Sequence, residues 1–79
     1  MESRVAVIGI VVENFDSVQQ LNMHEYSEYI IGRMGIPYKK RNVSVISVAI
    51  DAPNDVISAL SGKIGRLDGI TSKTVYAKL

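Results

Sequence analysis

Two stretches of this sequence predict strands that are apolar on both faces, and this feature constrains the fold most. Residues 5–12 read VAVIGIVV, and residues 43–51 read VSVISVAID. Successive side chains of a strand point to opposite faces, so a strand with one wet face alternates apolar and polar residues. These stretches instead carry β-branched side chains at odd and even positions alike, which is typical of a strand covered on two faces. We therefore expect two central strands with a buried front and a buried back.

Two helices are predicted between the strands. The first begins at Asn14, a good N-cap residue, and ends near His24. The second begins with Pro53, which suits the first position of a helix, and runs down to the turn signal Asp68-Gly69. The apolar side chains that share one face are Phe15, Val18 and Leu21 in the first helix and Val56, Ile57, Leu60, Ile64 and Leu67 in the second.

The two remaining strands have the character of sheet edges. Residues 28–38 are interrupted by Gly32 and Gly35 and closed by Pro37, which indicates a bulge and an edge position. Residues 70–78 are β-branched but largely polar. The order β-α-β-β-α-β predicts a single α+β domain over residues 1–79 with a ferredoxin-like fold, in which an antiparallel four-stranded sheet has strand order 4-1-3-2 and two helices lie on one face.

Two helices cover only one face of such a sheet, so the apolar second face of the central strands needs another partner. Burying one side chain of this kind contributes about 1.5–3 kcal/mol, and five of them contribute on the order of 10 kcal/mol, which matches the whole stability of a domain. We therefore expect a homo-oligomer, a dimer or a tetramer, that pairs either sheet face to sheet face or edge to edge.

Composition excludes several classes of function. The chain has 79 residues, no cysteine and one histidine, so disulfides, iron–sulfur ligation and cysteine nucleophiles are excluded, and we expect no metal and no cofactor. The net charge of +1 gives no argument for nucleic acid, and the central strands lack the aromatic residues on which RNA bases stack. The longest apolar run has eight residues, far short of a membrane span, so we expect a cytoplasmic protein without membrane contact.

The charges are divided unevenly along the chain. Residues 1–32 hold five acidic residues and one basic residue, whereas residues 33–79 hold eight basic and three acidic residues. Such a division most simply reflects pairing between elements or subunits, and a binding pole is the alternative.

No set of residues predicts catalysis, so we expect no enzyme and no catalytic residue. Ser61-Gly62-Lys63 resembles part of a phosphate-binding loop, but Ile57 stands where that loop needs a glycine. The segment around Arg33, between Gly32 and Gly35, allows two interpretations. Exposed backbone N–H groups beside a cation could hold an anion, or the glycines could form a bulge in an edge strand; we favour the bulge.

Three blocks carry a resemblance to a known family. YIIGRMGIPY (29–38), ISVAIDAP (46–53) and ISALSGKIGRLDGITSKTVYAK (57–78) resemble the iron-only hydrogenase system regulator family of small stand-alone bacterial domains. The resemblance implies an ACT-like fold, assembly into oligomers and a link to the control or maturation of iron-only hydrogenase. Because ACT-like domains hold small ligands at subunit interfaces, it also implies a binding site at Glu13, Asn14 and Gly62, with Arg33 as an anion anchor.

Two functional hypotheses follow. The first is a non-catalytic regulatory domain that senses a small ligand or a partner. The alternative is a structural assembly partner that docks on a hydrogenase maturation protein through its divided charges, without sensing a small molecule.

Overall fold

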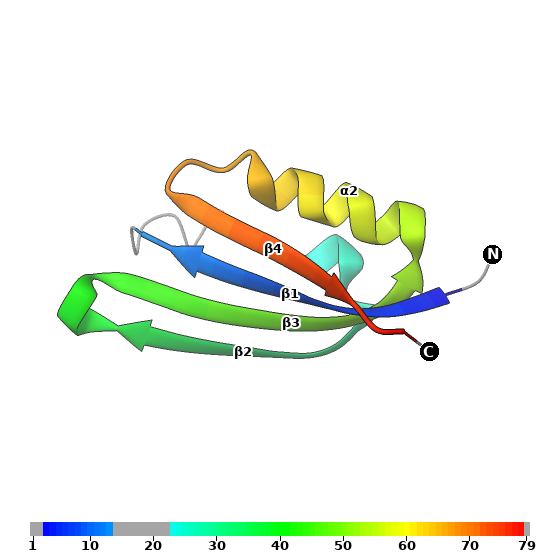
Figure 1. The fold of residues 1–79 in the computed structure, drawn as a ribbon, viewed down its shortest axis with the longest axis horizontal. Helices are drawn as coiled ribbons and strands as arrows, with labels where there is room; N and C mark the ends of the chain where they lie inside the picture. Colours follow the sequence, from blue (N-terminus) through cyan, green and yellow to red (C-terminus); the bar gives the residue numbers. More distant parts are fainter. Residues whose placement is uncertain (1–2, 14–22, 79) are drawn as a thin grey trace.

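The computed structural model describes residues 3–13 and 23–78, which form one α+β unit (Figure 1). Its elements are β1 (Ser3–Val12), the 3₁₀ helix η1 (His24–Tyr26), β2 (Ile30–Tyr38), the 3₁₀ helix η2 (Lys39–Arg41), β3 (Val43–Pro53), α2 (Asn54–Gly65) and β4 (Ile70–Tyr76). The four strands form one antiparallel sheet in the order β2-β3-β1-β4. This is the predicted strand order, counted from the other edge.

The helices differ from the prediction in extent. The first helix, expected from Asn14 to near His24, falls mostly on residues 14–22, which lie outside the described residues; its expected end lies at η1. Pro53 was predicted to occupy the first position of the second helix, but it does not. It closes β3 with an extended ψ of 150°, and the helix begins one residue later, at Asn54. The helix also ends at Gly65, before the predicted turn.

A bulge interrupts β2 near its start. The register between β2 and β3 shifts between Ile30 and Gly32, and the intervening Ile31 is exposed. The shift shows a bulge in this edge strand, a feature that discourages further strand pairing, but it lies at Ile31, just before the glycine-flanked segment for which it was predicted; residues 32–35 pair regularly with β3.

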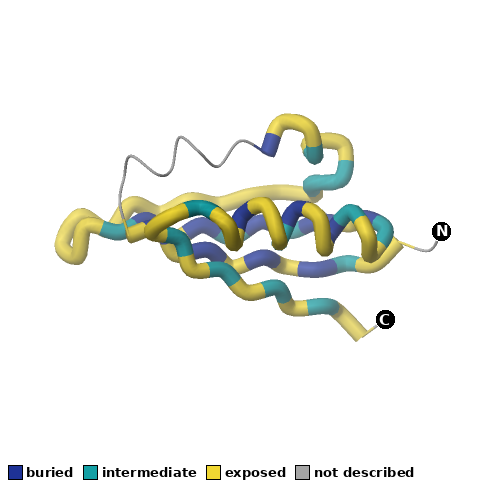
Figure 2. The backbone as a smooth tube through the Cα atoms, turned by 90° about the horizontal axis from the view of Figure 1, so that it is seen from above, coloured by how far each residue is buried: buried dark blue, intermediate teal, exposed yellow. Residues whose placement is uncertain are grey.

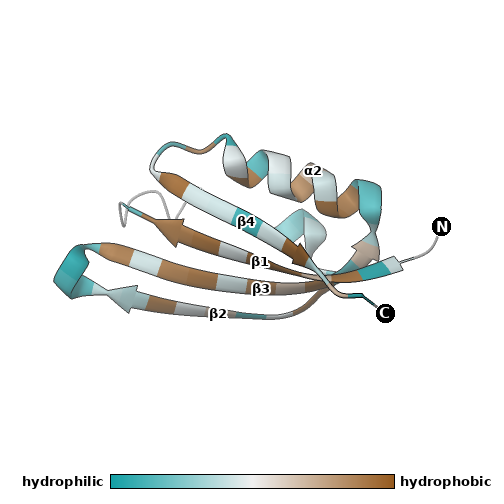
Figure 3. Ribbon diagram, in the orientation of Figure 1, coloured by the Kyte–Doolittle hydropathy of each residue, from teal (hydrophilic) through white to brown (hydrophobic). Residues whose placement is uncertain are grey.

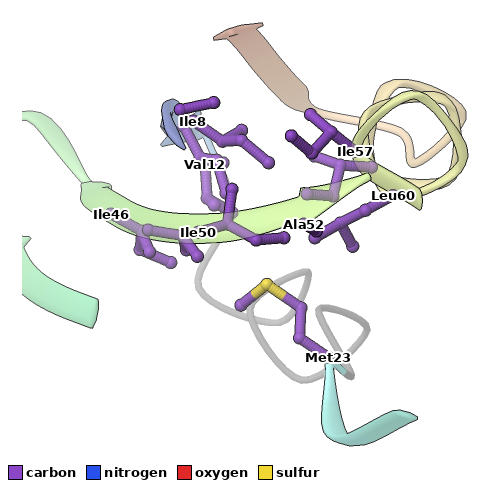
Figure 4. Packing of buried hydrophobic residues seen from close by; sticks show 12 residues of the cluster. Ile8, Val12, Met23, Ile46, Ile50, Ala52, Ile57 and Leu60 are labelled. Carbon is purple, nitrogen blue, oxygen red and sulfur yellow. The ribbon is translucent and has the colours of Figure 1, made fainter. Parts of the chain in front are cut away.

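One face of the sheet, which we call the covered face, contains the hydrophobic core. The even-numbered residues from Ala6 to Val12 in β1 and from Ser44 to Ala52 in β3 are buried and alternate with more exposed neighbours, as the colours along these strands show (Figure 2). The core consists of Ala6, Ile8, Ile10, Val12, Met23, Ile46, Val48, Ile50, Ala52, Ile57, Leu60 and Ile64 (Figure 4). Tyr26 and Tyr29 are half-buried against this core.

The opposite face, which we call the open face, has nothing packed on it among the described residues, although β1 and β3 are hydrophobic over most of their length (Figure 3). Apart from Ile31, every large exposed hydrophobic side chain in the described part of the chain belongs to it. These residues are Val7, Val11, Met34, Ile36, Tyr38, Val45 and Val75. β1 and β3 are central, as predicted, but a single chain buries only one of their two apolar faces.

Candidate functional site

The first predicted site residue, Glu13, lies at the end of β1. Its backbone N–H donates a hydrogen bond to the carbonyl oxygen of Gly69 at 2.8 Å. Gly69 has a φ of 72°, a left-handed conformation that glycine adopts without strain, and it ends the turn between α2 and β4. The end of β1 is therefore fixed against this turn, and the carboxylate of Glu13 is exposed beside it. Asn14, the next predicted site residue, lies outside the described residues.

Gly62 lies on the exposed side of α2. A Cβ atom added to Gly62 or to Gly65 would meet no atom within 4 Å among the residues that the structure describes. No second helix or backbone therefore approaches α2 closely at these glycines within the described chain. The neighbouring Ser61 points the other way, and its hydroxyl hydrogen-bonds to that of Thr74 at 2.7 Å, which fastens α2 to β4.

The resemblance of Ser61-Gly62-Lys63 to a phosphate-binding loop finds no support in the backbone. All three residues lie inside α2, and Ile57 is fully buried in the core. A phosphate-binding loop needs free backbone N–H groups ahead of a helix, whereas those in a helix interior are used by the helix itself.

Arg33 is separated from the other predicted site residues. It pairs with Val48 on β3 and is therefore on the covered side of the sheet, in the edge strand β2. Val12, the residue before Glu13, pairs with a β3 residue that in turn pairs with Pro37 on β2. Pro37 lies four residues along β2 from Arg33. Four residues of strand span about 13 Å, and two strand spacings separate β2 from β1. A small ligand bound at Glu13 would therefore not reach Arg33 in the same chain.

An ion pair that sequence reasoning missed connects η1 to α2. The ammonium group of Lys63 donates a hydrogen bond to the Glu25 carboxylate, and it lies 5.7 Å from the centre of the Tyr26 ring. The hydrogen bond to Glu25 raises the pKa of Lys63 above its ordinary value of 10.5. The division of charge along the sequence indicated pairing between the two halves of the chain, but it could not identify these two partners, which are 38 residues apart.

The described residues show no metal-binding constellation. Over residues 3–13 and 23–78, no three His, Asp or Glu side chains lie close enough together to hold an ion. Nor is any helix in that part of the chain long and apolar enough to cross a membrane.

Comparisons with known proteins identify a family. A solved structure of the uncharacterized protein TM1266 from Thermotoga maritima superposes with a TM-score of 0.91 at 38% identity, covering 98% of this chain and all of that one. A formyltetrahydrofolate deformylase from Pseudomonas putida KT2440 superposes with a TM-score of 0.61 at 12% identity. The match covers 90% of this chain but only 28% of the deformylase, and at this identity it shows a shared fold alone.

No curated protein matches the chain. The family model described as TM1266-like iron-only hydrogenase system regulator matches residues 4–74. That description suggests a regulatory role and names no ligand, target or site residue. The chain therefore belongs to the TM1266-like family, whose description links it to the iron-only hydrogenase system.

Proposed function

We propose that this protein is a non-catalytic regulatory domain of an iron-only hydrogenase system that senses a small ligand or a partner in the cytoplasm. The observation that carries the proposal is the family match over residues 4–74 together with the full-length likeness to TM1266. The sheet order β2-β3-β1-β4, with α2 on one face, supports the finer assignment to the ferredoxin-like, ACT-like class.

The proposed ligand site lies where β1 ends against the turn after α2. Glu13 presents an exposed side chain there, and Gly62 adds open space on the exposed side of α2, the helix that precedes this turn. A carboxylate at this position favours a ligand that carries an amine or another hydrogen-bond donor. Arg33 belongs to this proposal only as a separate anion anchor, because it is too distant to share a small ligand with Glu13 in one chain.

A thermal-shift screen with amino acids, nucleotides and divalent metal salts tests the sensing role. A ligand that binds only the folded state stabilises it by about 2.7 kcal/mol at one hundred times its Kd, which raises the Tm of a domain of this size by about 10–20 °C. We expect Glu13→Gln to weaken this shift, whereas Glu28→Gln, a matched change at another exposed carboxylate, leaves it unchanged. If no compound near saturation raises the Tm, the protein does not sense a ligand of these classes.

The assembly-partner function is the second candidate, and the hairpin between β2 and β3 favours it. Lys39, Lys40 and Arg41 form the exposed helix η2 at the tip of this hairpin, where they can contact an acidic surface. A pull-down from a native lysate, with Lys39→Glu/Arg41→Glu as the control bait, tests this role. Recovery of a hydrogenase maturation protein by the wild type alone supports it, and recovery of only the bait removes it.

A further inference from the structure

The open face has a regular pattern of large and small side chains. Strand pairing places its residues in rows that run from β4 through β1 and β3 to β2. The three central rows are Val75–Val7–Ala49–Gly32, Lys73–Gly9–Ser47–Met34 and Thr71–Val11–Val45–Ile36. The small residues of these rows lie next to one another and run from the β2 edge to the centre of the open face, and larger apolar side chains lie on either side of them. These small residues are Gly32, Ala49, Ser47 and Gly9.

Gly9, at the centre of this pattern, is not required by the fold of one chain. It lies in a central strand, its φ is not positive, and an added Cβ atom would meet only the carbonyl oxygen of Lys73, at an ordinary 3.9 Å. A glycine inside a strand is less stable than an alanine by about 0.5–1 kcal/mol, and it often marks a position that another backbone approaches closely. Nothing in the described chain makes that approach.

We propose that a second copy of this chain covers the open face, with the two sheets packed face to face around Gly9. The proposal concerns assembly and is independent of the ligand and the regulatory role proposed above. It commits to the sheet face, rather than the sheet edge, as the interface.

The pattern of the open face is complementary to itself, which a symmetric pair requires because each patch meets its own copy. A twofold axis along the strands, between β1 and β3, places each β1 against the partner's β3 and each β4 against the partner's β2. Val7 then faces a partner Ala49, Val75 faces a partner Gly32, and Gly9 faces a partner Ser47. Large side chains thus meet small ones in the first row, and the centre contains only glycine and serine.

The surface and its charges fit this occupant. The exposed fractions of the large open-face side chains run from 39% to 64%, which leaves on the order of 600 Å² of apolar surface per chain, close to the ~800 Å² per partner of a standard interface. Lys73 is the charged residue within the three central rows, and it lies on the edge strand β4. The same axis brings Lys73 beside the partner's Met34, so the two ammonium groups do not meet and each can reach solvent along its stem.

Sedimentation equilibrium of the purified protein between about 1 and 100 µM tests the pairing. We expect the wild type to be a dimer, or a tetramer built from such dimers. Val45→Glu, which places a carboxylate near the centre of the open face, should raise the Kd at least a hundredfold. Ala59→Glu, which places the same charge on the exposed side of α2, should leave it unchanged. A monomeric wild type at 100 µM, or equal association of the Val45→Glu variant, overturns the proposal.

Gly9→Val is a second test that does not depend on tolerance of a buried charge. Within one chain this substitution fits and suits a strand, so the folded monomer should be at least as stable as the wild type by urea unfolding at low concentration. In the proposed pair it forces the sheets apart, so the Kd should rise at least tenfold and the Tm should lose its dependence on protein concentration. Unchanged self-association of a well-folded Gly9→Val protein contradicts face-to-face packing at this position.

Discussion

The two faces of the sheet are built from the same two strands and have almost the same chemistry, yet they have opposite environments. On β1, the buried Ile8 and Ile10 alternate with the partly exposed Val7 and Val11. The covered face is dry because α2 and the segment around Met23 pack on it, whereas the open face lacks such a layer among the described residues. Apolar character alone therefore does not decide which side of a strand becomes core; the side on which the connecting segments pack does.

This comparison predicts the largest effect for a truncation on the covered face. Ile50→Ala should lower the free energy of unfolding by about 2–5 kcal/mol, because the side chain is fully buried and its removal leaves a cavity. Ile36→Ala on the open face, where the side chain is 50% exposed, should have a much smaller effect in dilute solution. Urea unfolding of both variants provides the measurement. Equal losses at low concentration would show that the faces do not differ in a single chain.

A pair of valine-to-threonine substitutions sharpens the comparison at constant shape. Val48→Thr should lower the stability by about 1–3 kcal/mol, since it buries a hydroxyl group in the core. Val45→Thr, three residues away and 45% exposed, should change the stability of the monomer by less than about 0.5 kcal/mol, as other surface substitutions do. The difference in urea midpoint between the two variants checks this. A Val45→Thr effect that appears only at high protein concentration would indicate that the open face is buried by association.

The attachment of α2 to the covered face should contribute less than the core does. Ser61→Ala removes the 2.7 Å hydrogen bond to Thr74 and should lower the stability by about 0.5–1.5 kcal/mol. Ser58→Ala is the matched control, because it makes the same change in helix propensity at an exposed position of α2. Thermal unfolding of the two variants should separate these contributions. If they have the same Tm, the Ser61 hydroxyl does not help to hold the helix on the sheet.

The ion pair on the outside of the covering layer should have the smallest effect. Its side chains are 45% and 61% exposed, so Lys63→Met should lower the stability only slightly, and less in high salt. Because the pKa of Lys63 is raised in the folded state, its contribution is fully present below the ordinary value of 10.5 and is lost as the pH rises through the folded-state value.

Thermal unfolding across this pH range, in low and high salt, checks the ion-pair prediction. Lys40→Met, a change of the same kind at η2, away from α2, is the control. A difference between the wild type and Lys63→Met that persists unchanged at pH values well above the lysine pKa would exclude the ion pair as its cause.

Sequence reasoning placed the strands well because their edges and centres differ in composition. Gly32 and Pro37 marked β2 as an edge, and the polar residues of 70–78 marked β4 as the other one, which left the two apolar strands for the centre. Contacts between distant residues were not predictable in this way. The Lys63–Glu25 pair and the Ser61–Thr74 hydrogen bond depend on how η1, α2 and β4 are packed, and no local pattern encodes that arrangement.

The candidate site shows the same limit. Family resemblance grouped Glu13, Gly62 and Arg33, but the fold sets Arg33 on an edge strand well away from Glu13. No role was predicted for Gly9, although a glycine within an otherwise β-branched strand is unusual and could have been noticed in the sequence. Its meaning depended on the space around it, which only the tertiary structure defines.

The amino-acid sequence by itself determined the alternation of strands and helix, the central position of β1 and β3, and the excess of apolar side chains on those strands, because each follows from local residue patterns. Only the tertiary structure decided which parity of the strands became core, which charged side chains met, and where a glycine leaves a surface open to close approach. These outcomes depend on the packing of segments that are distant in the chain, and several packings satisfy the same local preferences.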